Sequence, residues 1–247
     1  MSSTTSLPIT ARSRLKREIS LITTDPPPGV CCYVPGDQSN IANLRAQITG
    51  PEGSPFADAV FLLTVHIPPR YPFEPPKCRF VTNASSVSEC DGIYHPNIDT
   101  AGRICLDTLK SPPAGSWSPA VSLASLLLGI RTLLGQPNPD DGLMPDISNL
   151  YKTNMYKWEN EAKKRCSTFG SAEGVARLER MLDGIPDNFE EKDIVKNTTE
   201  DYNRKRYHDS SGNSENTKGD VVIICNDSNK KDNFESVGIC SKKSKIG

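Results

Sequence analysis

One cysteine of this chain lies in a setting that suits chemistry. Cys105 follows a His-Pro-Asn run at 95–97 and sits inside an Ile-Cys-Leu-Asp run at 104–107, in a stretch without helical or strand periodicity. A single cysteine between aliphatic residues is most often a packing residue, and a lone His-Pro-Asn is most often a turn. Irregular segments, however, present side chains better than they bury them. The combination makes Cys105 a candidate nucleophile.

The remaining cysteines offer no competing chemistry. They form no Cys-x-x-Cys pair, so their spacing gives little support to a zinc site or a thioredoxin-type site. Residues 1–13 lack the apolar core of a signal peptide, and no apolar run approaches the roughly 20 residues that span a bilayer. We therefore expect free thiols in a reducing compartment, the cytosol or the nucleus. These cysteines are Cys31, Cys32, Cys78, Cys90, Cys166, Cys225 and Cys240.

Charge and length narrow the class of protein. The 247 residues carry 29 Lys and Arg against 30 Asp and Glu, a net charge of −1. This balance argues against a general nucleic-acid binder or membrane-surface binder, because both need a basic excess to meet phosphates. The mean hydropathy of −0.47 is low for one packed globule of this length. We expect one domain of roughly 150 residues plus an extension.

The elements that must position Cys105 follow from periodicity and turn residues. The order predicts an α+β domain with an antiparallel four-stranded meander, because the strand candidates lie too close together for parallel crossovers. A proline-rich stretch at 68–76 is predicted to be an extended, rigid connection, and 136–142 a loop. Helices are expected at 11–24, from the cap Ser122 to 135, and at 146–151, 154–169 and 173–182. Strands are expected at 30–34, 44–49, 60–67 and 78–82.

Five ordered motifs then carry a resemblance to a known family. The chain from Leu15 to about Phe169 resembles the catalytic domain of ubiquitin-conjugating enzymes. The motifs are Tyr-Pro-Phe-x-Pro-Pro at 71–76, His-Pro-Asn at 95–97, Ile-Cys-Leu-Asp at 104–107, Trp-Ser-Pro at 117–119 and Pro-Asn-Pro-Asp-Asp at 137–141. Shorter features at 70–76, 112–115 and 179–186 resemble the branch of this family that serves the Fanconi anaemia DNA-repair pathway.

The resemblance implies a domain organisation. Residues 1–10 would be a flexible N-terminus, 11–170 the catalytic domain with its helix, meander, central helix and C-terminal helices, and 171–187 a short helical extension. Residues 188–247, charged and poor in periodicity, are expected to be disordered. An inserted polar segment at 83–92, which holds Cys90, departs from the family pattern.

The resemblance also implies a reaction. Cys105 would accept ubiquitin as a thioester from an activating enzyme and pass it to a substrate lysine with a RING-type ligase of the Fanconi type, giving substrate monoubiquitination in DNA repair in the nucleus or cytoplasm. ATP would be used by the activating enzyme, so no cofactor or metal is expected on this chain. Direct contact with nucleic acid or membrane is not expected. The alternative is an inactive variant that binds ubiquitin or the ligase.

Site roles come from the same match. Asn97 would support the negative charge that develops on the thioester carbonyl oxygen, or the loop that surrounds it. Asp141 would position the substrate lysine, and Asp107 would assist at the entrance of the groove that this lysine enters. Loop capping is the alternative role for both acids. His95 and Pro96 would be structural rather than catalytic.

The resemblance assigns contact surfaces as well. Lys110, five residues after Cys105, is a candidate for self-modification. Trp117 would be packed rather than exposed. The candidate ligase contacts are Arg14, Arg70, Phe73, Ser118 and Pro119, and the candidate contacts of the donor ubiquitin are Leu128 and Thr132.

Overall fold

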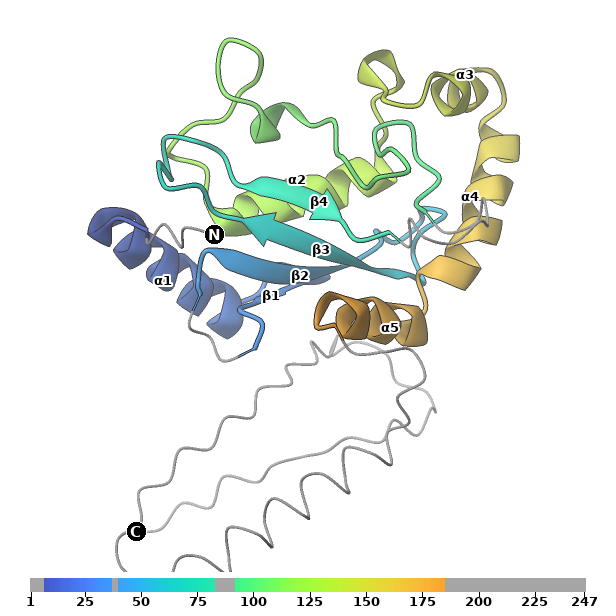
Figure 1. The fold of residues 1–247 in the computed structure, drawn as a ribbon. Coiled ribbons are helices and arrows are strands. Elements are labelled where there is room, and N and C mark those ends of the chain that lie inside the picture. The colour runs from blue at the N-terminus through green and yellow to red at the C-terminus, as the bar shows by residue number, and fades with distance from the viewer. Residues whose placement is uncertain (1–6, 37–39, 83–91, 185–247) are drawn as a thin grey trace, which may run out of the picture.

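A four-stranded antiparallel sheet forms the centre of the molecule (Figure 1). The computed structural model describes residues 7–36, 40–82 and 92–184. The strands follow one another in space as they do in sequence, so the predicted meander is confirmed. They are β1 (Val30–Tyr33), β2 (Asn43–Thr49), β3 (Val60–His66) and β4 (Lys77–Phe80).

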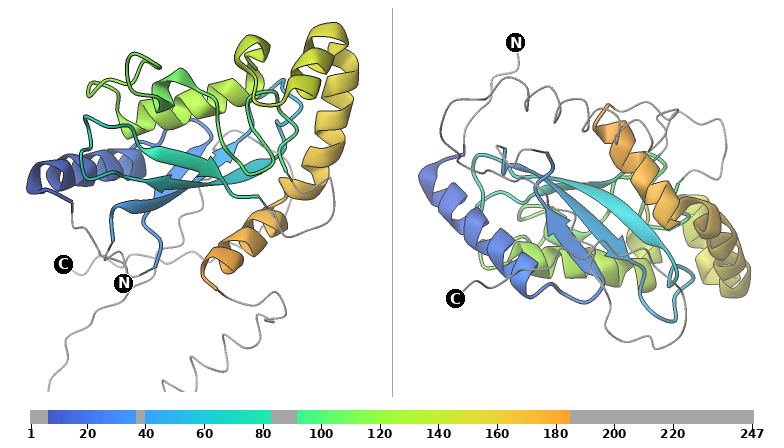
Figure 2. Two further views of the ribbon diagram at one scale, coloured as in Figure 1. Left: turned by 45° about the horizontal axis from the view of Figure 1, so that its top comes forward. Right: turned by 90° about the horizontal axis from the view of Figure 1, so that it is seen from below.

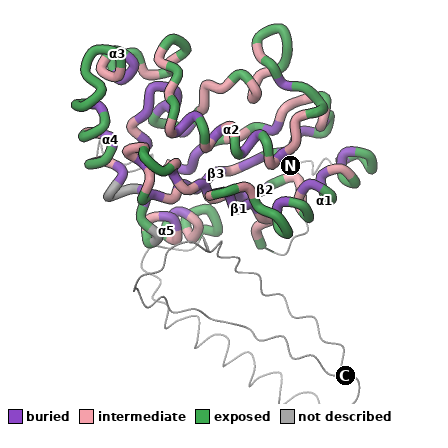
Figure 3. Tube along the Cα trace, turned by 180° about the vertical axis from the view of Figure 1, so that it is seen from behind, coloured by how far each residue is buried: buried purple, intermediate pink, exposed green. Residues whose placement is uncertain are grey.

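The inner face of the sheet is apolar because alternate residues of each strand point to one side. Cys32 pairs with Ala46, Ala46 with Leu63 and Leu63 with Phe80, and all four side chains are buried in the core. The burial pattern in Figure 3 shows the sheet and the central helix as the mostly buried part of the molecule.

The central helix α2 (Leu123–Gly135) covers this inner face. Ser122 caps it as predicted, accepting a hydrogen bond from the backbone N–H of Ser125. One apolar stripe of the helix is buried, as its periodicity indicated. Its members are Leu123, Leu126, Leu127, Ile130, Leu133 and Leu134.

Helix α1 (Ile9–Thr24) packs against β1 and α2. It begins two residues earlier than expected, so Ile9 and Thr10 belong to a helix rather than to a flexible N-terminus. Two more helices follow the site loop, α3 (Pro145–Thr153) and α4 (Met155–Phe169), close to their predicted positions. In the described ranges, no helix is long and apolar enough to cross a membrane.

The predicted helical extension is α5 (Ala172–Leu182), and it packs on the sheet face opposite α2 (Figure 2). Val175 and Leu178 bury its apolar side. Polar contacts fix its end: Tyr33 donates to Glu179, Gln47 Nε2 donates to Glu179 Oε1 at 2.8 Å, and Arg45 pairs with Asp183. The extension therefore forms one packed unit with the sheet as far as the structure describes it.

The prediction of an extended connection at 68–76 is wrong. Residues 69–74 turn back, with Tyr71 N donating to Pro68 O at 3.0 Å and Phe73 N to Arg70 O at 2.8 Å. Proline restricts its own φ but is well suited to turns, so a proline-rich stretch does not require an extended chain. The expected insertion at 83–92, apart from Gly92, and the expected disordered tail at 188–247 lie outside the described residues.

Candidate active site around Cys105

Cys105 is held in place by an irregular ladder between β4 and α2. Its backbone N–H donates to Asn97 O at 2.9 Å, and Ile98 bridges to both His95 and Ile104. Gly102 makes the turn before the thiol with φ of +76°, and an added Cβ would lie 2.0 Å from Phe80 O. Only glycine fits this position without a shift of backbone. The thiol is partly exposed at the end of the ladder.

His95 is fully buried and already uses both ring nitrogens. Nε2 lies 2.9 Å from the carbonyl of Leu133, and Nδ1 lies 3.0 Å from the backbone N of Asn97. Because a carbonyl can only accept and an N–H can only donate, the ring is neutral with its proton on Nε2. Burial lowers the pKa of His95 to about 4. These contacts fit a structural role, tying the site loop to α2.

The side chain of Asn97 joins the Cys105 segment to the loop at 138–141. Its Nδ2 donates to Asn138 O at 2.7 Å and to Asp141 O at 3.0 Å, and its Oδ1 accepts from Asn138 N at 2.9 Å. Asn97 is completely buried. Every polar atom of the amide is therefore engaged in holding that loop, which continues as the short 3₁₀ helix η2 (Pro139–Asp141).

The loop brings Asp141 to the thiol. Cys105 Sγ lies 3.0 Å from Asp141 Oδ2, although the two residues are far apart in sequence. Burial raises the pKa of the Cys105 thiol and the hydrogen bond to Asp141 raises it further, whereas Lys110 lowers it. The hydrogen bonds from Cys105 and Lys110 hold the pKa of the Asp141 carboxyl below its usual range.

Lys110 completes this group. Its Nζ lies 3.2 Å from Cys105 Sγ and 3.1 Å from Asp141 Oδ2. Asp107 begins the 3₁₀ helix η1 (Asp107–Leu109), and its carboxylate lies 3.6 Å from Lys110 Nζ. Sequence reasoning named Lys110 only as a target for modification and missed its contact with the thiol. The short helical turn that bends residue 110 back toward 105 gave no periodic signal.

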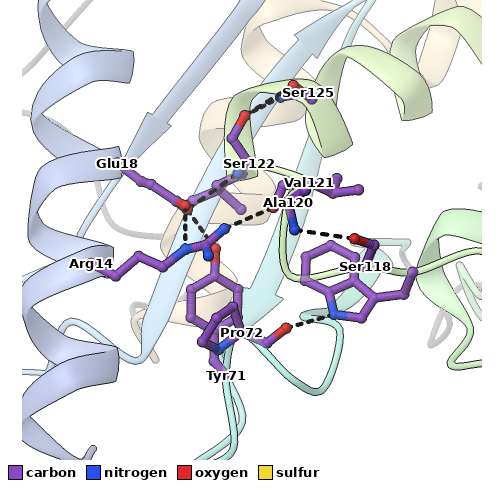
Figure 4. Close-up of polar contacts among 11 residues, drawn as sticks. Arg14, Glu18, Tyr71, Pro72, Ser118, Ala120, Val121, Ser122 and Ser125 are labelled. Carbon is purple, nitrogen blue, oxygen red and sulfur yellow. Dashed lines mark hydrogen bonds and ion pairs between the residues drawn. The ribbon is translucent and has the colours of Figure 1, made fainter.

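A second cluster joins three elements behind the predicted ligase surface (Figure 4). Buried Glu18 on α1 accepts hydrogen bonds from Arg14 Nε at 2.8 Å, from the Tyr71 hydroxyl and from Leu123 N at 3.2 Å. Arg14 also donates to Val121 O at 3.1 Å and lies over the Tyr71 ring. Sequence reasoning missed Glu18 and Tyr71. A glutamate three residues after Leu15 and four before Ile22, on the apolar stripe of its helix, was the available signal.

The other predicted surface residues lie around this cluster. Phe73 is 72% exposed at the 69–74 turn, and Arg70, Ser118 and Pro119 are also exposed. Trp117 is buried, as expected, and its Nε1 donates to Pro72 O at 2.9 Å. The structure therefore places Phe73, Arg70, Ser118 and Pro119 on neighbouring loops, whereas Arg14 is engaged by the network beneath them.

Leu128 and Thr132 share one exposed face of α2. They are four residues apart, and the Thr132 hydroxyl donates to Leu128 O at 2.9 Å. Across the described ranges, no group of three metal-binding side chains occurs.

Comparisons with known proteins agree with this architecture. Residues 14–166 match the family model described as ubiquitin-conjugating enzyme. The similar proteins include relatives named Ubiquitin-conjugating enzyme E2 T. The chain is 51% identical to the Xenopus laevis protein over 152 residues, which are 62% of this chain and 73% of that protein. For the Homo sapiens protein the identity is 46% over 175 residues, which are 71% of this chain and 83% of that protein. For the Bos taurus protein the identity is 54% over 142 residues, which are 58% of this chain and 67% of that protein.

These matches confirm the resemblance that the five motifs indicated. The relatives' shared name also agrees with the branch of the family that the features at 70–76, 112–115 and 179–186 indicated. The helix, meander and central helix likewise confirm the expected fold class. Because the family model matches residues 14–166, more than half of the chain, the chain belongs to the ubiquitin-conjugating enzymes.

Proposed function

We propose that the chain carries ubiquitin as a thioester on Cys105 and transfers it to a substrate lysine together with a RING-type ligase. The observation that carries the proposal is the partly exposed Cys105 thiol, 3.0 Å from the Asp141 carboxylate, in a segment that Asn97 locks to the Asp141 loop. Nucleophile and carboxylate thus meet in one fixed geometry at the surface.

In the loading step, the Cys105 thiolate attacks the thioester carbonyl of ubiquitin on the activating enzyme. A new C–S bond forms, and the cysteine of the activating enzyme leaves as a thiolate. ATP is consumed by the activating enzyme before this exchange. Cys105 needs no cofactor or metal for the step, because a thiolate is already a strong nucleophile.

In the discharge step, the substrate amine must be neutral to attack, although a lysine in water has a pKa of about 10.4. The Asp141 carboxylate accepts a hydrogen bond from this amine and orients it toward the thioester carbonyl beside Cys105. The amine nitrogen forms the isopeptide C–N bond, the C–S bond to Cys105 breaks, Cys105 leaves as a thiolate, and the extra proton on the nitrogen passes to water. The Asp107 carboxylate lies 3.6 Å from Lys110 Nζ and would assist Asp141 by attracting the substrate amine to the site. Asn97 acts through the loop that it holds, because its Nδ2 is already donating to two carbonyls.

The ligase would bind the loops that carry Phe73, Ser118 and Pro119, with Arg70 and Arg14 at their edge. Leu128 and Thr132 on α2 would contact the donor ubiquitin. The motifs at 70–76, 112–115 and 179–186 support a ligase of the Fanconi type, substrate monoubiquitination in DNA repair, and residence in the nucleus or cytoplasm. A net charge of −1 supports contact with DNA through the ligase and the modified protein rather than directly.

One assay tests the core of this proposal. The full chain is incubated with activating enzyme, ATP and ubiquitin, and a thiol-sensitive adduct is expected on non-reducing gels. Cys105→Ser should give an oxyester that resists thiols, whereas Cys78→Ser should still give the thiol-sensitive adduct. A folded chain that forms no adduct would favour the alternative, a variant that only binds ubiquitin or the ligase.

A further inference from the structure

Lys110 contacts the Cys105 thiol and two carboxylates, those of Asp141 and Asp107. Its Nζ lies 3.2 Å from Cys105 Sγ, 3.1 Å from Asp141 Oδ2 and 3.6 Å from Asp107 Oδ1. Asp141 also contacts the thiol, at 3.0 Å, and a carboxylate at that distance disfavours the thiolate. Lys110 is therefore the cation that contacts both the nucleophile and the carboxylate beside it.

The loop after Lys110 holds the residue in place. The backbone N–H of Lys110 donates to Asp107 O at 3.0 Å, and Trp117 N donates to Lys110 O at 3.1 Å. Gly115 packs so closely that an added Cβ would lie 2.4 Å from Lys110 Cβ. Trp117 is in turn buried and bonded to Pro72 O. The folded loop thus holds the ammonium group of Lys110 beside the thiol, and only 35% of the Lys110 side chain is exposed.

The contact between Asp141 and the thiol puts opposite requirements on the loading step and the discharge step. Asp141 serves the discharge step, but at 3.0 Å from Sγ its charge opposes formation of the thiolate that loading requires. An ammonium within hydrogen-bonding distance of both atoms offsets this repulsion.

We propose that Lys110 is a catalytic residue, the shared counter-ion that stabilises the Cys105 thiolate during loading and then competes with the substrate lysine for Asp141. This inference rests on the proposed function, since it assigns Lys110 a role in both of its steps. The same amine would assist the first step and hinder the second.

The loading step gives the assisting role. The Cys105 proton leaves to water, and the thiolate keeps its hydrogen bond from Lys110 Nζ until the new C–S bond to the ubiquitin carbonyl forms. The cysteine of the activating enzyme departs with the electron pair of the broken C–S bond. Because Lys110 only donates a hydrogen bond, it stays protonated throughout.

The hindering role follows from the product of loading. A thioester sulfur carries no negative charge, so Lys110 loses that partner and keeps its two carboxylates. One of them, Asp141 Oδ2, is the acceptor that the incoming amine needs. The substrate lysine must therefore displace Lys110 from Asp141 before it can attack.

The pH dependence of Cys105 alkylation tests the first role without ubiquitin. Iodoacetamide labelling of the full chain, followed at the Cys105 peptide by mass spectrometry, gives a midpoint for each variant. Lys110→Gln should raise this midpoint by about one pH unit, which means about tenfold slower labelling below it. Lys110→Arg, which retains the charge, should restore most of the shift.

Lys152→Gln is the matched control, because Lys152 pairs with Asp140, the neighbour of Asp141, at 2.6 Å. It should leave the midpoint unchanged. Equal midpoints for the natural chain and Lys110→Gln would overturn the counter-ion role. A shift of the same size in Lys152→Gln would also overturn it, since the effect would then come from general surface charge.

Single-turnover assays test the second role. Lys110→Gln should load severalfold more slowly near neutral pH, yet its loaded form should discharge to free lysine severalfold faster, measured from the dependence of the rate on lysine concentration. Slower discharge would overturn the competition. If alkylation shifts but no variant loads, the proposed function fails while the contact of Lys110 with the thiol stands. If all variants load and alkylation is unshifted, only the role of Lys110 fails.

Discussion

The buried side chain of Asn97 holds the backbone of Asp141, with Nδ2 donating to the Asp141 carbonyl at 3.0 Å. The same amide exchanges two hydrogen bonds with Asn138, while the carbonyl of Asn97 accepts from Cys105 N. One residue thus spans the segment with the nucleophile and the loop with the carboxylate. The distance between the thiol and Asp141 depends on this link.

Replacing Asn97 should therefore affect both stability and discharge. Asn97→Ala leaves the N–H of Asn138 and two carbonyls without their partner, at a cost of about 1–3 kcal/mol for each group that water does not reach. We expect about 3 kcal/mol less stability by urea unfolding, and discharge to lysine slowed more than loading. The exposed Asn149 on α3 gives a control, Asn149→Ala, which should change neither quantity.

The two roles weighed for Asn97 separate in this experiment. Loop support requires that stability and discharge fall together. Full stability with a loss of discharge would instead assign Asn97 to the oxyanion, since a donor used only in the transition state contributes nothing to folding.

Asp141 should matter for discharge far more than for loading. Asp141→Asn removes the charge that orients the substrate amine, so the rate of discharge to free lysine should fall at least tenfold. Because Asp141 raises the pKa of the Cys105 thiol, its removal should lower that pKa, and alkylation of Cys105 near neutral pH should speed up. Asp140→Asn is the adjacent control and should change neither rate. An equal loss in loading and discharge would contradict the assignment of Asp141.

Phe73 should be needed only when a ligase is present. Its side chain is 72% exposed on a turn held by backbone hydrogen bonds, so Phe73→Ala should leave the unfolding free energy within about 0.5 kcal/mol. Loading of Cys105 should persist, while ligase-stimulated transfer should be lost. Tyr156→Ala, at an aromatic that is 76% exposed on α4, is the matched control. Normal ligase stimulation in Phe73→Ala would place the ligase elsewhere.

Glu18 should support the same surface from below. Glu18→Ala leaves Arg14 Nε, the Tyr71 hydroxyl and Leu123 N without their shared acceptor, which costs about 2–4 kcal/mol. We expect a lower urea midpoint, and a higher ligase concentration for half-maximal transfer, because Arg14 and the 69–74 turn lose their anchor. Glu52→Ala, at an exposed turn residue, is the control. An unchanged ligase requirement would mean that the network serves folding alone.

The sequence predicts the repeating elements of this fold well, because their side-chain periodicity directly reflects burial. Strand β3 and helix α2 illustrate this, since each carries an apolar pattern that matches its buried face. The prediction for 68–76 was wrong because proline limits the chain locally without fixing whether it extends or turns. Only the family motifs predicted that Cys105, Asn97 and Asp141 lie together in one site, and these motifs gave no distances between them.

The contact between Lys110 and the thiol was not predictable in this way. It depends on η1 and on the close approach of Gly115, and neither leaves a periodic trace in sequence. The buried hydrogen-bond network of Glu18 and Tyr71 was not predictable either. A charged residue on an apolar stripe indicates a buried partner, but its partner is distant in sequence and becomes visible only in three dimensions.

The buried His95 should make stability depend on pH. Its pKa is lowered to about 4 in the folded chain, against about 6.5 when unfolded. Below pH 6.5 the unfolded chain therefore binds a proton that the folded chain does not, so stability is complete above that pH and falls as pH drops toward 4. This group alone should cost about 2 kcal/mol between pH 7 and pH 5. Urea unfolding at both pH values should show that loss, and His95→Gln should be less stable at pH 7 but should lose about 2 kcal/mol less on acidification. His66→Gln, at an exposed histidine, should keep the full loss; an undiminished loss in His95→Gln would show that other groups cause it.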